Sequence, residues 1–227
     1  MARSGLWLRW SLRDLRSRWP LVVAIGLVLA IGTGVYSGLG SMKDWRIASN
    51  DASYEALRAH DLEIALTEGT SAAGGSLSRL IDEIPAADRI AVSEERLLVS
   101  TQVEIPRANR DPLLSSAQIV GSPLGPDGPP VDGVYAAAGE ALGRSDEGRP
   151  VAVLERGFAG FHDLPEAGLL NLPGGERLRY VGVGGSPEAF MVTREGGGEF
   201  GGAEARLALV FTSLRTAQSL AGAGDRV

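Results

Sequence analysis

The sequence predicts an α+β protein in which one N-terminal transmembrane helix precedes a mixed, strand-rich extracytoplasmic domain. The first observation is that no charged residue occurs between Trp19 and Met42. The second is that later segments alternate apolar and polar residues, which is typical of half-buried strands. The third is composition: 44% hydrophobic and 22% charged residues in a chain of 227 are typical of a folded protein with a buried core.

The candidate membrane span is Leu21–Gly40, inside a transmembrane helix that we expect at residues 20–42. Twenty residues that each rise about 1.5 Å cover the hydrocarbon core, which is roughly 30 Å thick. Pro20 suits the first turn of a helix, where an N–H group has no partner within the helix. All four Trp lie outside the span, as the preference of Trp for the headgroup region predicts. The predicted membrane-interface residues are Trp7, Trp10, Trp19 and Trp45.

Arginines are concentrated before the span and predict its orientation. Residues 1–19 carry five Arg and one Asp, a charge of +4 in a chain of net charge −6, which leaves −10 on the remaining residues. The positive-inside rule therefore places residues 1–19 in the cytoplasm and residues 43–227 outside the plasma (inner) membrane. The predicted orientation signal is Arg9, Arg13, Arg16 and Arg18. The acidic outer part argues against binding to nucleic acid, which needs a positive surface.

Two questions about the N-terminal region stay open at this point. A signal peptide cleaved before Ser41 is the alternative to a retained anchor, although its apolar core would exceed the usual length of about 7–15 residues. Residues 6–19 are either an amphipathic helix in the membrane interface or a charged segment without an ordered helix. The apolar face of such a helix would hold Leu8, Leu12, Leu15 and Trp19.

Period-two alternation predicts the strands of the outer domain, which we expect at residues 43–227. The first is Asp61–Thr67, where Leu62, Ile64 and Leu66 alternate with more polar side chains. The same pattern or a short β-rich run predicts strands at residues 89–93, 99–105, 151–154, 178–184 and 206–211.

Helical spacing and capping residues predict the helices of the outer domain. A short helix is expected at residues 51–59, and an apolar stripe predicts another at residues 77–84, which Pro85 ends. Residues 156–161 suggest a helical turn. A last helix is expected from a cap at Thr212 or Ser213 to about Leu220, with Gly222 ending it.

Glycine and proline indicate the loops. Residues 121–133 hold four Gly and four Pro in thirteen positions, which indicates a loop or a subdomain junction. Gly182–Gly185 is interpreted as a tight turn, because it lacks the spacing of a dinucleotide-binding loop. Glycines at 196–198 and 201–202 predict a further turn.

The motifs of catalysis are missing from the sequence. It contains no Cys, which excludes disulfides, thiolate zinc sites and cysteine nucleophiles. It contains neither the phosphate-binding G-x-x-x-x-G-K-[ST] nor the G-x-S-x-G of serine hydrolases. We interpret His60 and His162 as structural or solvent-facing, and the neighbouring acids Glu94 and Glu95 as solvated surface. We therefore expect no enzyme activity, no cofactor and no metal site in this chain.

Three segments resemble the N-terminal half of an FtsX-like, MacB-type ABC transporter permease. They are YEALRAHDL at residues 54–62, PVAVLERGFA at 150–159, and LRYVGV at 178–183 with Ser186-Pro187-Glu188. In such permeases a short apolar strand lies between the second and third segments, and it is expected here at residues 168–172. Gly139-Glu140 departs from the Gly-Arg that relatives often have. The resemblance covers nearly the whole chain.

The resemblance implies a function and partners. Such a chain is the membrane-anchored part of a permease subunit, and its outer domain, a MacB-like periplasmic core domain, changes shape as a separate cytoplasmic ABC-type ATPase cycles. Implied cargoes are lipids, lipoproteins, peptides or drugs. Membrane lipids and a second permease subunit or a homodimer are further implied partners. Because such permeases have three more membrane helices, we expect this chain to be a fragment, incomplete at its C-terminus.

A different class of protein stays open beside the permease. The chain has a single apolar span, which would also suit an anchored extracytoplasmic adaptor or sensor that binds a partner protein and needs no ATPase.

Overall fold

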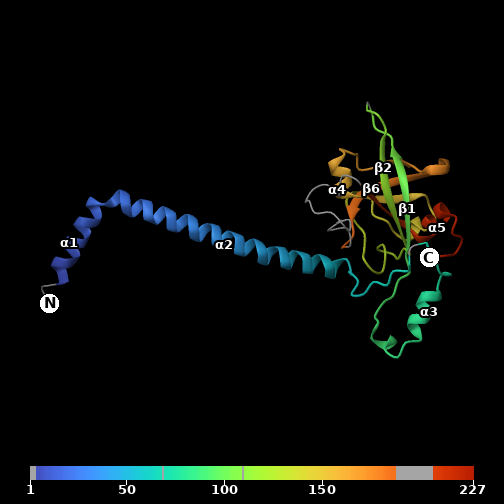
Figure 1. The fold of residues 1–227 in the computed structure, drawn as a ribbon, viewed down its shortest axis with the longest axis horizontal. Helices are drawn as coiled ribbons and strands as arrows, with labels where there is room; N and C mark the ends of the chain where they lie inside the picture. Colours follow the sequence, from blue (N-terminus) through green and yellow to red (C-terminus); the bar gives the residue numbers. More distant parts are fainter. Residues whose placement is uncertain (1–3, 68, 109, 188–206) are drawn as a thin grey trace. The chain divides into compact units, whose positions relative to one another are not determined.

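The computed structural model describes residues 4–67, 69–108, 110–187 and 207–227 (Figure 1). Its internal contacts divide the chain into two compact units, Met1–Ala52 and Ser53–Val227. The described part of the first unit is helical, and the second unit is rich in strands. The predicted α+β class, with one apolar helix before a strand-rich domain, is confirmed.

Two helices make up the N-terminal region, α1 (Ser4–Ser17) and α2 (Trp19–Ala56). Among the described residues, α2 is the one helix that is long and apolar enough to cross a membrane. Its most apolar window has a mean hydropathy of 2.0, and none of that window is buried inside the protein. The helix considered at residues 6–19 is formed as far as Ser17 in α1, whereas Trp19 begins α2. Its place in a membrane interface stays a prediction.

Helix α2 is longer than the span that the sequence predicts. Its 38 residues correspond to a length of about 57 Å, well beyond a hydrocarbon core of roughly 30 Å. The prediction of a separate helix at residues 51–59 is wrong, because residues 51–56 continue α2 without a break. No Gly or Pro occurs between Ser41 and Ala56, so nothing in the local sequence ends the helix earlier.

Seven strands of the second unit form one mixed sheet in the order β3-β6-β4-β7-β2-β1-β5. Strand β5 also pairs with β6, so six of the strands close into a ring. The pairs β2–β7 and β4–β6 are parallel, and the other pairs are antiparallel. The strands are β1 (Leu97–Ile105), β2 (Leu113–Ser122), β3 (Tyr135–Gly139), β4 (Val151–Glu155), β5 (Gly168–Asn171), β6 (Arg177–Gly185) and β7 (Leu207–Ser213).

Short helices connect the strands. The cap of α5 is local: the Ser213 hydroxyl accepts the N–H of Thr216, and Gly222 ends the helix with a φ of +62°. The α-helices are α3 (Ser76–Asp82), α4 (Arg156–Phe161) and α5 (Leu214–Ala221), and the 3-10 helices are η1 (Ala87–Arg89), η2 (Arg144–Asp146) and η3 (Pro173–Gly175).

The core has two hydrophobic clusters. The larger one includes Phe158 of α4 and Ala217 of α5, packed with strand residues such as Val210. The smaller one includes Val153 and Phe211, packed with apolar residues of the connecting loops. Neighbouring residues of β4 and β7 therefore enter different clusters, which explains why these strands are continuous apolar runs in the sequence.

Two predicted strands are wrong. Asp61–Thr67 has no strand structure, and residues 89–93 hold the end of η1 followed by irregular chain. Both segments have the right alternation, but a strand also needs a ladder partner. Neither segment pairs with another strand among the described residues.

The interpretation of Gly182–Gly185 as a tight turn is also wrong, because these residues form the end of β6. A side chain at Gly184 would collide with the main-chain oxygen of Tyr135, and one at Gly182 with that of Glu140. The glycines therefore allow β3 to approach β6 closely. Strands β2 and β3 have no counterpart among the sequence predictions.

The remaining element predictions agree with the structure. Strands lie at the predicted sites of β1, β4, β5, β6 and β7, and helices at those of α3, α4 and α5. Of the loop expected at residues 121–133, residues 123–133 lie outside the named strands and helices, whereas residues 121 and 122 end β2. The predicted turn at residues 196–202 and Glu188 of the resemblance lie outside the described residues.

Candidate functional site

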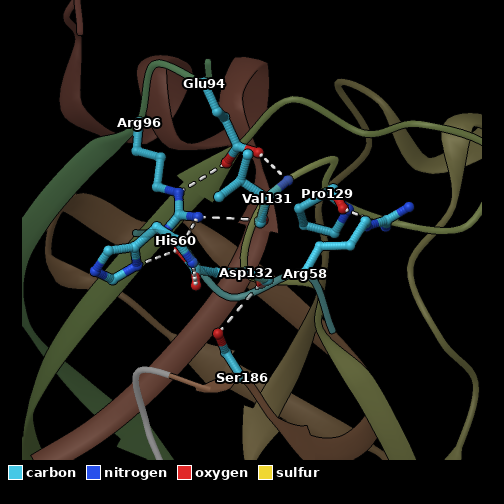
Figure 2. Close-up of polar contacts among 8 residues, drawn as sticks. All are labelled: Arg58, His60, Glu94, Arg96, Pro129, Val131, Asp132 and Ser186. Carbon is cyan, nitrogen blue, oxygen red and sulfur yellow. Dashed lines mark hydrogen bonds and ion pairs between the residues drawn. The ribbon is translucent and has the colours of Figure 1, made fainter. Parts of the chain in front are cut away.

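A buried polar cluster joins the residues that directly follow α2 to two loops of the outer domain, and we name it the Asp132 cluster (Figure 2). All of its members belong to the second unit of the chain. They are Arg58, His60, Glu94, Arg96, Pro129, Val131, Asp132 and Ser186.

Main-chain hydrogen bonds hold the two chain segments together. The N–H of Asp132 donates to the carbonyl of Arg58 at 3.0 Å, and the N–H of Gly133 donates to the carbonyl of Leu57 at 2.7 Å. Asp132 and Arg58 both have left-handed backbones, with φ of +45° and +52°. Asp tolerates this conformation better than most residues, because its short side chain can make local hydrogen bonds. The hydroxyl of Ser186 donates to the carbonyl of Asp132 at 3.2 Å.

The carboxylate of Asp132 is the centre of the cluster, with its side chain 2% exposed. It accepts hydrogen bonds from the main-chain N–H of His60 at 3.0 Å and from Arg96 Nη2 at 2.6 Å. It also lies 2.8 Å from His60 Nδ1. Because an ionised carboxylate can only accept, this ring nitrogen carries the hydrogen. Three donors thus compensate the burial of one negative charge.

A second buried carboxylate, that of Glu94, completes the cluster. It accepts from Arg96 Nε at 2.7 Å and from the N–H of Val131 at 2.9 Å. Arg96 also donates to the carbonyl of Val131 at 3.1 Å. Every buried side-chain polar atom in the described part of the chain has a hydrogen-bond partner. The guanidinium of Arg96 therefore bridges two buried acids and the loop between them.

The environment of Asp132 lowers its pKa below the ordinary value of 3.8. Burial alone would raise the pKa, because it disfavours the charged form. The hydrogen bonds from His60 and the positive charge of Arg96 outweigh that effect. The pKa of Glu95 is also lowered: hydrogen bonds from the N–H groups of Ser78 and Gly75 outweigh the effect of burial.

We expect the outer domain to lose stability as the pH falls below about 4. A carboxyl group whose pKa is lower in the folded state stabilises the fold fully above its unfolded pKa, and this contribution disappears as the pH falls through the folded value. For Asp132 the loss begins at its ordinary pKa of 3.8. Pulse proteolysis in urea at about pH 6 and about pH 3 measures it.

Asp132→Asn is the control for this pH dependence. The variant keeps a side chain that tolerates a left-handed backbone but has no carboxyl to protonate. Its unfolding midpoint is expected to fall less than that of the wild type between the two pH values. Equal losses in both proteins would contradict the assignment to Asp132.

The Asp132 cluster is not arranged as a hydrolytic triad. A His-Asp pair occurs in serine hydrolases, but there the serine hydroxyl bonds to the histidine. Here Ser186 donates to the main chain of Asp132 instead. His162 packs against Phe158 and Phe161, with ring centroids 4.6 and 5.0 Å apart. Both histidines therefore have structural contacts, in agreement with their interpretation as structural or solvent-facing. The Asp132 cluster holds the residues that follow α2 against the loop at residues 131–133.

The interpretation of Glu94 as solvated surface is wrong, because its side chain is 2% exposed. Neither Asp132 nor Arg96 was predicted as a site residue. The available signals were the Gly- and Pro-rich loop and the Asp132-Gly133 pair, which is typical of a turn. They indicate an unusual backbone at Asp132 but not the partners of its side chain. These partners, Arg96 and His60, lie 36 and 72 residues away in the sequence.

The residues that the sequence predicts at the membrane lie in the helical unit. The exposed fractions of Trp7, Trp10, Trp19 and Trp45 are 75%, 72%, 62% and 71%. Of the predicted orientation signal, Arg13, Arg16 and Arg18 are exposed, and the side chain of Arg9 is outside the description. Arg18 lies 3.4 Å from Asp14. The roles of these residues at a membrane stay predictions.

No family model and no curated protein matches the chain. The solved structures that are similar to it include two transporter outer domains. The periplasmic region of MacB from Actinobacillus actinomycetemcomitans is 13% identical, with a TM-score of 0.47 over 75% of this chain and 69% of that chain. The extracellular domain of the noncanonic ABC-type transporter YknZ from Gram-positive bacteria is 11% identical, with a TM-score of 0.41 over 75% of this chain and 76% of that chain.

Proposed function

We propose that this chain is the membrane-anchored part of an ABC transporter permease subunit. Its outer domain couples a conformational change, driven by a separate cytoplasmic ATPase, to the handling of a substrate at the outer face of the membrane. In this proposal the retained anchor is residues 20–42 of α2, residues 1–19 are cytoplasmic, and the outer domain is residues 43–227.

The observation that carries the proposal is the way the Asp132 cluster holds the chain after α2. Leu57 and Arg58 accept main-chain hydrogen bonds from residues 132 and 133, and His60 donates to the buried carboxylate of Asp132. Arg96, on the other side of this carboxylate, directly precedes β1. A displacement of Leu57 would therefore be transmitted to the sheet through these hydrogen bonds and not through a flexible loop.

The position of these contacts in the sequence supports the same function. Leu57, Arg58 and His60 lie inside the segment 54–62 that carries the resemblance to the permeases. Helix α2 also continues sixteen residues beyond Gly40, which is about 24 Å at 1.5 Å per residue. A helix transmits displacement along its axis better than a flexible linker, because its main-chain hydrogen bonds fix each turn.

Purification of the full-length chain from its native membrane tests the proposed partner. We expect an ATP-binding ABC-type subunit to copurify in mild detergent. A matched control is the chain in which Arg13 and Arg16 are replaced by Ala, because it separates binding that depends on these charges from binding through the span. Copurification of an extracytoplasmic protein without any ATPase would contradict the proposal and favour an adaptor or sensor.

Cysteine labelling tests the proposed orientation, and the absence of native Cys gives a clean background. In intact cells, a membrane-impermeant maleimide is expected to label Asn50→Cys and not Ser4→Cys, because only the former lies outside. Permeabilised cells provide the control, since both variants should then react. Labelling of Ser4→Cys alone in intact cells would show that the orientation is the opposite of the one proposed.

A further inference from the structure

Helix α2 ends with the hydrogen bonds of a Schellman motif. The N–H of Arg58 donates to the carbonyl of Glu55 at 3.2 Å, and the N–H of Ala59 donates to the carbonyl of Tyr54 at 2.9 Å. This motif needs a left-handed residue just after the helix, which is usually Gly. In α2 it is Arg58, with a φ of +52°. An arginine thus occupies a position where its β-carbon makes the required backbone unfavourable.

Helix α5 ends with the same motif but has the usual residue. Its left-handed residue is Gly222, and the N–H groups of Gly222 and Ala223 donate to carbonyls of the last turn at 3.2 and 2.9 Å. The sequence around α2 favours a different outcome. Residues 57–60, LRAH, include the strong helix formers Leu, Arg and Ala, and no Gly or Pro occurs between Ser41 and Gly69. Local sequence therefore explains the end of α5 but favours continuation of α2.

The loop that contains Asp132 takes the hydrogen bonds that a longer α2 would make. In a continued helix, the carbonyls of Leu57 and Arg58 would accept N–H groups four residues further along. Here they accept those of Gly133 and Asp132, at 2.7 and 3.0 Å. The N–H of His60 would donate to the carbonyl four residues before it, and here it donates to the carboxylate of Asp132 at 3.0 Å. The loop thus replaces three helical hydrogen bonds one for one.

The side chain of Arg58 also holds the left-handed backbone. Its Nη2 donates to the carbonyl of Pro129 at 2.8 Å, in the same loop. Contacts with the loop therefore offset the unfavourable backbone of Arg58, and a longer helix would avoid that backbone altogether. Two arrangements that exchange hydrogen bonds and differ at one strained residue are typical of a conformational switch.

We propose that the end of α2 is a switch with two states. In the docked state Arg58 is left-handed, and the loop at residues 129–133 ends the helix at Ala56. In the undocked state Arg58 is right-handed, and residues 57–60 continue α2 by about 6 Å. The docked state links the end of α2 to the sheet, and the undocked state releases it. The use of this switch for coupling rests on the proposed function, whereas its two states require no ATPase.

Two variants of Arg58 test whether its left-handed backbone controls docking. Arg58→Gly and Arg58→Ala both lose the bond to Pro129, but only Gly adopts the left-handed conformation without a steric penalty. Hydrogen exchange of the full-length chain in detergent measures docking at the N–H groups of Asp132 and Gly133. We expect exchange to be about tenfold faster in Arg58→Ala than in Arg58→Gly. Equal rates in the two variants would overturn the proposal.

A metal clamp tests whether the undocked segment is helical. Two His side chains four residues apart on one face of a helix bind Zn²⁺ together. Ala56→His therefore forms a Zn²⁺ site with the native His60 only in the longer helix. At a Zn²⁺ concentration ten times the Kd of this site, exchange at Asp132 and Gly133 is expected to be about tenfold faster. Glu55→His is the matched control, because residues five apart do not share a helix face.

The metal clamp separates a longer helix from a frayed end. The proposal requires faster exchange with Zn²⁺ in Ala56→His and unchanged exchange in Glu55→His. It is overturned if Zn²⁺ has no effect on Ala56→His. It is also overturned if both variants respond equally, because binding to His60 alone would then open the cluster. Neither result depends on an ATPase, so copurification tests the proposed function separately.

Discussion

Replacing Asp132 by Ala is expected to lower the free energy of unfolding of the outer domain by about 3 kcal/mol. The carboxylate is 2% exposed and accepts hydrogen bonds from His60 and Arg96. Its removal leaves a largely buried guanidinium facing an empty site and its donors without an acceptor. Ala also tolerates the left-handed backbone at position 132 poorly. Asp132→Asn is expected to lose less, because its side-chain oxygen still accepts.

Pulse proteolysis in urea measures this loss. Tryptophan fluorescence is a poor probe here, because all four Trp lie in residues 1–52. Asp88→Ala is the matched control: Asp88 is an exposed acid in η1, and its loss should change stability by less than about 0.5 kcal/mol. If both Ala variants unfold at the same urea concentration, the Asp132 cluster does not hold the domain together.

Placing Arg at both Val28 and Leu29 is expected to abolish stable membrane insertion. Each charge at the centre of a span costs about 2.5–3.5 kcal/mol on insertion scales, against a few tenths gained by each apolar residue. The protein should move from the pellet to the supernatant after carbonate extraction of the membranes. This effect would be nearly complete, because no other described helix is long and apolar enough to replace α2 as a span.

The same change beyond the span provides the control. Arg at both Ile47 and Ala48 lies in the part of α2 that follows Gly40, where the helix is exposed, so insertion should be unaffected. Wild-type protein that leaves the membrane in carbonate, or that lacks its first forty residues, would show that the apolar segment is a signal peptide and not an anchor.

Local sequence was enough to predict the elements whose signals are local. The turn of α4, the Ser213 cap and the Gly222 end of α5 depend on residues within one or two helical turns. The apolar stretch of α2 is predictable for a similar reason, because the length of a span depends only on consecutive residues. The strands of the ring with clear alternation or short apolar runs were also found, to within a few residues.

What the sequence could not determine depends on partners that lie far along the chain. Glu94 has the sequence context of a surface acid, and its burial involves a loop 37 residues away, where the N–H of Val131 donates to its carboxylate. Asp61–Thr67 has the pattern of a strand, but a ladder needs a second strand, and none pairs with it among the described residues. Periodicity determines which side chains share a face. Only the tertiary structure decides what that face meets, because burial and pairing are properties of two segments and not of one.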